Sequence, residues 1–199
     1  LNVNSGGTMS GQGNVVFVLG NKSFNLQNGD NFTFSGLEVF TSGNGVFRVG
    51  GNLTVTDHLR YYAAGTGNFA VLSGGSVNAQ NAYMYLNEGN IEWESSANLN
   101  MHAPPQDDPD GLGGLLVHKP YGNDKRITFN GGSNVVLYGT FMAPTSPITL
   151  NGQAGFELHS QIIGWDYLIN GGAKADIWYE ADENYNPPVA ADPTIEFTK

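Results

Sequence analysis

A short motif recurs at a nearly constant interval in the second half of this chain. An apolar residue followed by Asn-Gly occurs three times, and the glycines are at the almost evenly spaced positions 131, 152 and 171. When the sequence is aligned on these glycines, further apolar residues fall into columns. The columns are Ile127, Ile148 and Tyr167; Phe129, Leu150 and Ile169; Val135, Phe156 and Ala175; Leu137, Leu158 and Ile177; and Phe141 with Ile162.

A period of about 20 residues is typical of one coil of a β-solenoid, in which each turn supplies two or three short strands. A single coil cannot bury its own interior, so the next coil places like residues over it. Asn-Gly suits the corners because both residues tolerate positive φ. Asn-Gly also marks hairpins in a meander, but hairpins do not require matched columns at a constant period. The sequence therefore predicts an all-β, right-handed parallel β-helix (β-solenoid) with coils of about 20 residues.

The composition agrees with many short strands joined by turns. Glycine accounts for 28 residues, and charged residues make up 13% of the chain, about half the usual share. Short apolar runs closed by Gly, Asn, Ser or Pro follow one another, and uninterrupted helical periodicity is absent from the sequence. Strands this short and frequent fit a solenoid better than a sandwich. The first half carries the repeat more loosely.

The repeat and its interruptions predict how the chain is organised. Residues 1–183 are expected to form a single β-solenoid domain. A surface loop is expected at about 99–114, because the prolines at 104, 105 and 109 exclude a central strand. Residues 184–199 are expected to form an extended tail that covers or extends the last coil, since an open solenoid end exposes unpaired strand edges.

Charge and cysteine content narrow the partners and the chemistry. The formal net charge is -10, which disfavours nucleic acid and polyanionic glycans as partners. The chain has no cysteine, so it contains neither disulfides nor zinc-thiolate sites. No apolar run reaches the ~18 residues of a membrane helix. Because the chain opens at Leu1 without a signal-like segment, we interpret it as a mature or excised fragment, with any anchor upstream.

Carboxylates provide the enzyme hypothesis. Polysaccharide hydrolases built on β-helices need two or three carboxylates on one sheet face. Glu92 and Glu94 flank Trp93 at strand spacing and are expected to share a face, but an exposed, solvated pair is the favoured interpretation. The basic residues form no cluster for a lyase. We therefore assign no catalytic residues and expect that the protein is not an enzyme.

A calcium site is the one cofactor hypothesis that the sequence raises. Asp107, Asp108 and Asp110 lie in a flexible loop, and Ca²⁺ takes several oxygen ligands from such loops. The loop lacks the spacing of an EF-hand, so a solvated acidic turn is the favoured interpretation, calcium is the alternative, and no cofactor is assigned. The four histidines are far apart in the sequence and lack metal-ligand spacing.

Aromatic residues provide the binding hypothesis. A flat solenoid face can present rings that stack on sugar faces, while core packing is the alternative use for the same residues. Tyr and Trp are more numerous than a core requires. The candidates for ligand binding are Tyr61, Tyr62, Tyr83, Tyr85 and Trp93.

Several segments of the second half resemble a known family. These are residues 114–124, 127–131, 139–144, 159–164 and 184–188, which read GLLVHKPYGND, ITFNG, GTFMAP, HSQIIG and NYNPP. They are similar to the C-terminal β-helical region of bacterial pilus-assembly surface proteins of the PilX and Tad type. The resemblance implies a secreted protein at the cell envelope or on a pilus, with cell-surface or pilus proteins as partners, and supplies no catalytic residue. A looser resemblance to tāpirins, which are β-helical adhesins, implies adhesion to polysaccharide.

Together these observations predict a non-catalytic structural or adhesive module on the outside of a bacterial cell, able to self-associate. The alternative is a carbohydrate-binding adhesin that grips polysaccharide through surface Tyr and Trp. A polysaccharide-cleaving β-helix enzyme is the third hypothesis.

Overall fold

The computed structural model describes residues 6–130, 134–152, 155–172 and 174–186, and in these ranges the chain forms seventeen strands and no helix. The described part therefore contains no helix that is long and apolar enough to cross a membrane. The strands are β1 (Thr8–Gly20), β2 (Phe24–Leu26), β3 (Asn31–Thr41), β4 (Phe47–Val49), β5 (Asn52–Ala63), β6 (Phe69–Val71), β7 (Ser76–Ala79), β8 (Ala82–Leu86), β9 (Ile91–Trp93), β10 (Asn98–His102), β11 (Leu115–His118), β12 (Ile127–Phe129), β13 (Asn134–Tyr138), β14 (Thr140–Asn151), β15 (Gly155–His159), β16 (Ile162–Asn170) and β17 (Lys174–Trp178).

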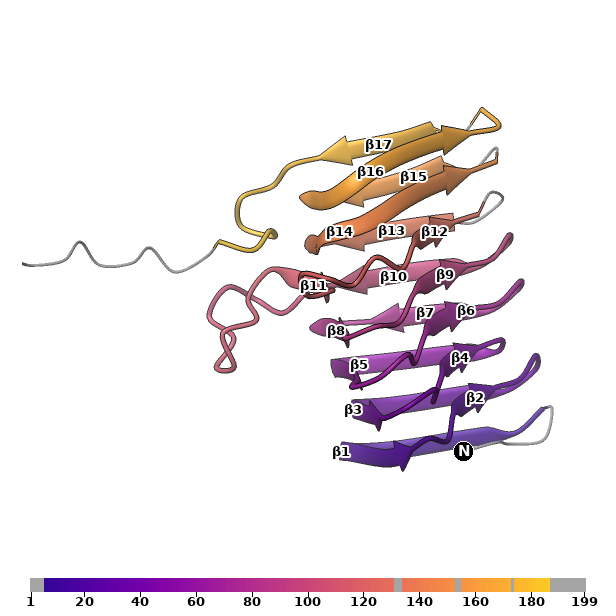
Figure 1. Cartoon of the computed structure of the whole chain (residues 1–199). Coiled ribbons are helices and arrows are strands. Elements are labelled where there is room, and N and C mark those ends of the chain that lie inside the picture. Colours follow the sequence, from indigo (N-terminus) through magenta and orange to yellow (C-terminus); the bar gives the residue numbers. More distant parts are fainter. Residues whose placement is uncertain (1–5, 131–133, 153–154, 173, 187–199) are drawn as a thin grey trace, which may run out of the picture.

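The strands stack as a β-solenoid of about seven turns with parallel pairing throughout (Figure 1). The first sheet contains the N-terminal parts of β1, β3 and β5, followed by β7, β10, β13, β15 and β17. The second sheet contains the C-terminal parts of β1, β3 and β5, then β8, β11 and the N-terminal parts of β14 and β16. The third sheet contains β2, β4, β6, β9, β12 and the C-terminal parts of β14 and β16.

The register confirms the columns derived from the sequence. Leu137 pairs with Leu158, and Leu158 pairs with Ile177. Ile127, Ile148 and Tyr167 form a second series in the third sheet. Each coil advances by about 22 residues. The step from Asn98 to its partner Asn134 is longer, because an insertion follows β10. The all-β solenoid prediction is therefore confirmed.

The inserted loop begins later than the sequence analysis predicted. Residues 99–102 belong to β10, where Leu99 and Met101 are buried and pair with Val77 and Ala79. Their alternation of apolar and polar side chains continues the repeat, which the nearby prolines concealed. The irregular segment covers residues 103–114 and protrudes from the stack beside the segment that follows β17 (Figure 1). Gln106 holds the two segments together, because its amide donates to the carbonyl of Asn184 at 2.8 Å.

Inward side chains fill a narrow core. The aromatic rings of Phe24, Phe47 and Phe69 follow one another in the third sheet, with centroid distances of 4.8 and 5.2 Å and edge-on geometry. All three are fully buried, and each contributes about 2–3 kcal/mol through removal of apolar surface from water. Each coil is therefore stabilised by the contacts that its inward side chains make with the coils before and after it.

A second column, made of glycines, brings the coils into close contact at one corner. Gly45, Gly67 and Gly89 are evenly spaced in the sequence, one on each of three successive coils. A Cβ on Gly67 would lie 2.1 Å from the carbonyl oxygen of Gly45, and a Cβ on Gly89 would lie 1.8 Å from that of Gly67. Only glycine allows the backbones to approach this closely.

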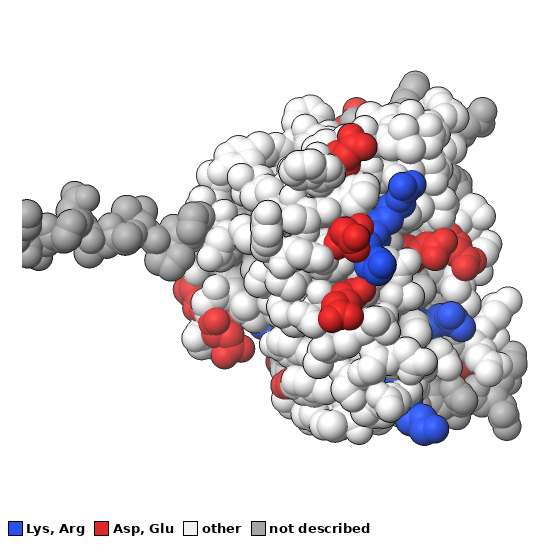
Figure 2. Space-filling model, in the orientation of Figure 1, with Lys and Arg blue, Asp and Glu red and all other residues white. Residues whose placement is uncertain are grey.

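The surface carries few charges. Figure 2 shows acidic and basic side chains scattered over one face and separated by broad uncharged areas.

Asn184, the first residue of the predicted tail, is buried and donates through Nδ2 to the carbonyl of Glu180 at 2.7 Å. Residues 187–199 of that tail lie outside the described residues.

Candidate functional site

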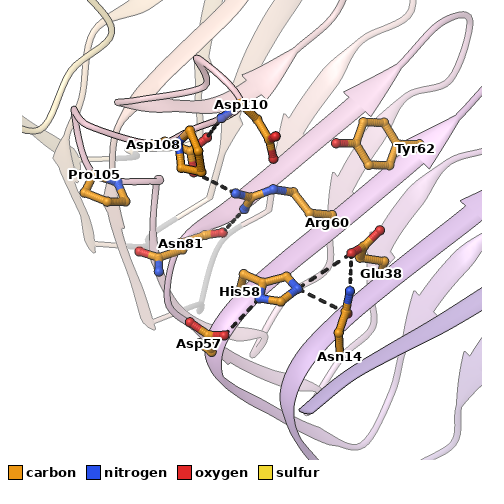
Figure 3. A pocket seen from close by; sticks show the side chains of 11 residues that line it. Asn14, Glu38, Asp57, His58, Arg60, Tyr62, Asn81, Pro105, Asp108 and Asp110 are labelled. Carbon is orange, nitrogen blue, oxygen red and sulfur yellow. Dashed lines mark hydrogen bonds and ion pairs between the residues drawn. The ribbon is translucent and has the colours of Figure 1, made fainter.

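The candidate site is a cavity of about 380 Å³ on the outer face of the second sheet, beside the loop of residues 103–114. Its floor comes from outward-facing side chains of three successive coils, on β1, β3 and β5, and the loop forms its roof (Figure 3). The lining residues are Asn14, Glu38, Asp57, His58, Arg60, Tyr62, Asn81, Pro105, Asp108, Pro109 and Asp110.

A histidine network forms one wall of the cavity. Asn14, Gly36 and His58 are paired in register on successive coils. A Cβ on Gly36 would lie 2.3 Å from the His58 ring, so glycine leaves the space through which His58 reaches Asn14. The distance from His58 Nε2 to Asn14 Oδ1 is 3.2 Å, and the distance from His58 Nδ1 to Asp57 Oδ2 is 3.1 Å. Both ring nitrogens therefore face oxygen acceptors.

Glu38 joins this network from the neighbouring position on β3. Its Oε1 accepts a hydrogen bond from Asn14 Nδ2 and lies 3.8 Å from His58 Nε2. The side chain remains about a quarter exposed, so the carboxylate can accept further hydrogen bonds from a ligand in the cavity.

An ion pair fixes the loop over the sheet. Arg60 Nη2 lies 2.9 Å from Asp108 Oδ2, and both side chains are more than 90% buried. Arg60 also donates to the carbonyl of Asn81, while Asp108 Oδ1 accepts from the amide of Asp110 at 3.0 Å. A buried pair of this kind adds little net stability, but it sets the position of the roof relative to the floor.

An outward ladder of rings borders the cavity. Phe40 and Tyr62 stack in parallel, with centroids 4.9 Å apart and an angle of 7° between planes. The register continues from Tyr62 to Tyr85 and then to His118. Burial raises the pKa of Tyr62 and lowers the pKa of His118, so both side chains are neutral near pH 7. The ladder therefore places uncharged, partly exposed rings beside charged and amide groups.

The structure separates the five aromatic candidates into two groups. Tyr62 and Tyr85 face outward and are half-buried, while Tyr83 faces outward but is only 4% exposed. Its hydroxyl lies 3.3 Å from His118 Nδ1, and burial raises its pKa. The predicted strip does not extend to Tyr61 and Trp93, which are fully buried in the core.

These two rings have structural roles instead. Tyr61 donates to the carbonyl of Asn68 at 3.1 Å, and burial raises its pKa to about 12. Trp93 packs edge-on against Phe129 at 4.4 Å. Tyr61 and Tyr62 are adjacent, and strand alternation sends one ring into the core and the other to the surface.

Glu92 and Glu94 do not share a strand face. The strand β9 ends at Trp93, so only Glu92 is on the strand, where it faces solvent. Glu94 lies in the following turn and accepts from the amide of Ser73 at 3.1 Å. Glu92 belongs to the third sheet and Glu94 follows directly after it, and neither residue lines the cavity on the second sheet.

The loop aspartates take different positions. Asp108 contacts Arg60 and loop amides, whereas Asp107 and Asp110 are exposed, and Asp110 lines the cavity. Across the described ranges, no group of three or more His, Asp or Glu side chains is placed to hold a metal ion. The calcium site stays a prediction, and at Asp108 the ion would compete with the Arg60 guanidinium.

The sequence analysis missed Asn14, Glu38, His58 and Arg60. A signal was present, because Glu38 and Arg60 are polar residues at equivalent positions of two successive apolar runs, one coil apart.

Comparison with protein-family models, with curated proteins and with solved structures finds no match to this chain.

Proposed function

We propose that this protein is a non-catalytic adhesive module of a bacterial surface or pilus, and that it holds a neutral polysaccharide in the cavity beneath the loop. The observation that supports this proposal is the combination of Tyr62 with Glu38, Asn14 and His58 in one hollow of about 380 Å³. A ring with nearby amide and carboxylate oxygens suits a sugar, which has an apolar face and a rim of hydroxyl donors.

The charge of the cavity favours a neutral chain over an acidic one. Glu38, Asp57 and Asp110 line it, while the charge of Arg60 is matched by Asp108. Uronic acid or sulfate groups would be repelled by these carboxylates, which no Lys or Arg in the lining neutralises. We therefore expect cellulose-like or chitin-like polymers to bind better than pectin.

Surface location rests on the family resemblance and on the fold. Four of the five segments that resemble pilus-assembly proteins begin in or beside the strands β11 to β16, and the fifth, which begins at Asn184, follows β17. A parallel solenoid presents a long, regular outer surface, which suits display and adhesion. Cell-surface or pilus proteins are the partners that this assignment implies.

The test is a binding assay on insoluble cellulose, chitin and pectin with wild type and three variants. Tyr62→Ala removes the ring and Glu38→Gln removes the charge, whereas Tyr121→Ala removes a tyrosine that is 87% exposed outside the cavity. We expect Tyr62→Ala to weaken binding to a neutral polymer at least about tenfold, and Tyr121→Ala to leave it unchanged. Equal binding by wild type and Tyr62→Ala would exclude this cavity as the site.

The same polymers also test the enzyme hypothesis. Released sugar ends are measured with wild type and Glu38→Gln. Turnover that disappears in Glu38→Gln would replace the adhesive proposal by a polysaccharide-cleaving one, because Glu38 is a partly exposed carboxylate on the cavity floor.

A further inference from the structure

The C-terminal end of the stack exposes core positions. Among the described strands, β16 pairs with β14 and β17 pairs with β15, so each has one free edge. Ile169 and Ile177 face inward in their columns but are 62% and 56% exposed. Together with Ile148, Leu150 and Ile162 they line an apolar hollow of about 520 Å³.

The N-terminal end shows the complementary arrangement. Within the described part, β1 pairs with β3 and β2 pairs with β4, so these strands too have free edges. The inward side chains of Met9, Val15, Phe17 and Leu19 pack on the core from one side and remain partly exposed. The two ends therefore present opposite edges of the same three sheets.

A second copy can continue all three sheets. Its β1 would follow β17 in the first sheet and the N-terminal part of β16 in the second, and its β2 would follow the C-terminal part of β16 in the third. The outward column that contains the ring ladder also continues from one copy to the next. It begins at Val18, which is 79% exposed, and ends at Ile163.

The distribution of charge favours contact between the C-terminal end of one copy and the N-terminal end of another. Residues 155–186 contain six acidic residues and one lysine, whereas residues 8–26, which form β1, β2 and the turn between them, contain Lys22 as their single charged residue. Two C-terminal ends would repel each other, whereas a C-terminal end meets an almost neutral, slightly basic N-terminal end.

We propose that copies of this chain stack head to tail, the first coil of one copy covering the last coil of the next. Such a contact is heterologous and does not close on itself, so it produces linear assemblies. Free strand edges with exposed apolar side chains are the structural elements that drive such pairing. The contact is separate from the cavity and does not depend on polysaccharide binding.

The test uses one variant for each end. Ile169→Asp places a charge on the C-terminal end, and Met9→Asp places one on the N-terminal end, with Val18→Asp as a second N-terminal variant if Met9→Asp is misfolded. Tyr121→Asp is the control, because this residue lies in the turn between β11 and β12. Masses are measured by sedimentation over a wide range of concentration, after circular dichroism has confirmed folding.

We expect wild type and Tyr121→Asp to form species larger than dimers as concentration rises. Each blocked variant should remain monomeric, and a mixture of the two should form dimers and stop there. Dimers of the N-terminal variant alone would show C-terminal ends meeting each other and would overturn the proposal. A wild type that stays monomeric at every concentration would also overturn it and would indicate that the end is covered within its own chain, for instance by residues 187–199.

Discussion

The middle coils and the last coil carry the same repeat but bury it to very different extents. Leu137 and Leu158 are fully buried, whereas Ile177, the next residue in their column, is 56% exposed. The third sheet repeats the contrast, from Leu150 at 7% exposed to Ile169 at 62%. In a stack of coils, a side chain is buried by the coils above and below it, so position decides its energetic weight as much as residue type does.

The largest difference in stability is expected when a charge is placed in this column, once in a middle coil and once in the last coil. Leu137→Asp puts an unpaired carboxylate into the core, and we expect a loss of about 5 kcal/mol or more, enough to unfold the protein. Ile177→Asp leaves the carboxylate in water and should cost less than about 1 kcal/mol. Urea denaturation at low protein concentration measures both.

A conservative change in the same position controls for packing. Leu137→Met keeps the volume and should cost less than about 1.5 kcal/mol. If Ile177→Asp proved as damaging as Leu137→Asp, the last coil would be covered in the monomer, and the contrast between the coils would disappear.

Glycines provide the second test of the comparison. In the middle of the stack, Gly67→Ala would bring a methyl group within 2.1 Å of the Gly45 carbonyl oxygen, so the coils must separate, at a cost of about 3 kcal/mol. In the last coil, Gly172 has φ of +74°, and no heavy atom lies within 4 Å of the place that an alanine methyl group would take. Gly172→Ala should therefore cost only the backbone strain of about 1 kcal/mol. Thermal unfolding of the two variants compares these costs.

The middle coils also contain a lysine whose charged form is costly to bury. Lys119 is fully buried and donates to the carbonyl of Lys125, and burial lowers its pKa to about 7. The folded state binds this proton less tightly than the unfolded state does, so the contribution of Lys119 to stability should rise with pH by about 2–3 kcal/mol between about pH 6 and pH 9. Urea denaturation across this range should show the rise.

Lys119→Met separates this residue from other titrating groups. Methionine keeps the apolar stem and removes the ammonium, so the variant should be more stable than wild type near pH 6 and should lose most of the rise with pH. An unchanged pH profile in Lys119→Met would mean that the ammonium reaches water.

The sequence revealed the fold where the corner motif is regular. Apolar-Asn-Gly at positions 129–131, 150–152 and 169–171 aligned the C-terminal coils, and the observed register follows that alignment. The first half has equally regular coils, but its corner column is Gly45, Gly67 and Gly89. Glycine is so frequent in this chain that this column did not stand out, and the insertion after β10 lengthened one step of the repeat.

The site was less accessible to sequence analysis, for two physical reasons. Strand alternation gives neighbouring residues opposite fates, so Tyr61 and Tyr62 cannot be assigned to core or surface until the register is known. The cavity also depends on contact across the insertion. Arg60 and Asp108 are 48 residues apart, and no local pattern shows which loop aspartate meets the arginine.

Asn130, Asn151 and Asn170 lie on successive coils and form a ladder of side-chain hydrogen bonds. In this ladder we expect the smallest difference in stability between the coils. Asn151 donates to Asn130 Oδ1 at 3.0 Å and accepts from Asn170 Nδ2 at 3.0 Å, whereas Asn170 is exposed at the top of the ladder. Asn151→Ala removes two hydrogen bonds and should cost about 1 kcal/mol, while Asn170→Ala removes one and should cost about 0.5 kcal/mol or less. Asn151→Asp should cost more than Asn151→Ala, because a carboxylate cannot donate to Asn130 Oδ1 and its charge repels that oxygen. Equal losses for the two alanine variants in urea denaturation would mean that the ladder is as constrained at its end as in its middle, and that burial by a following coil adds nothing to these bonds.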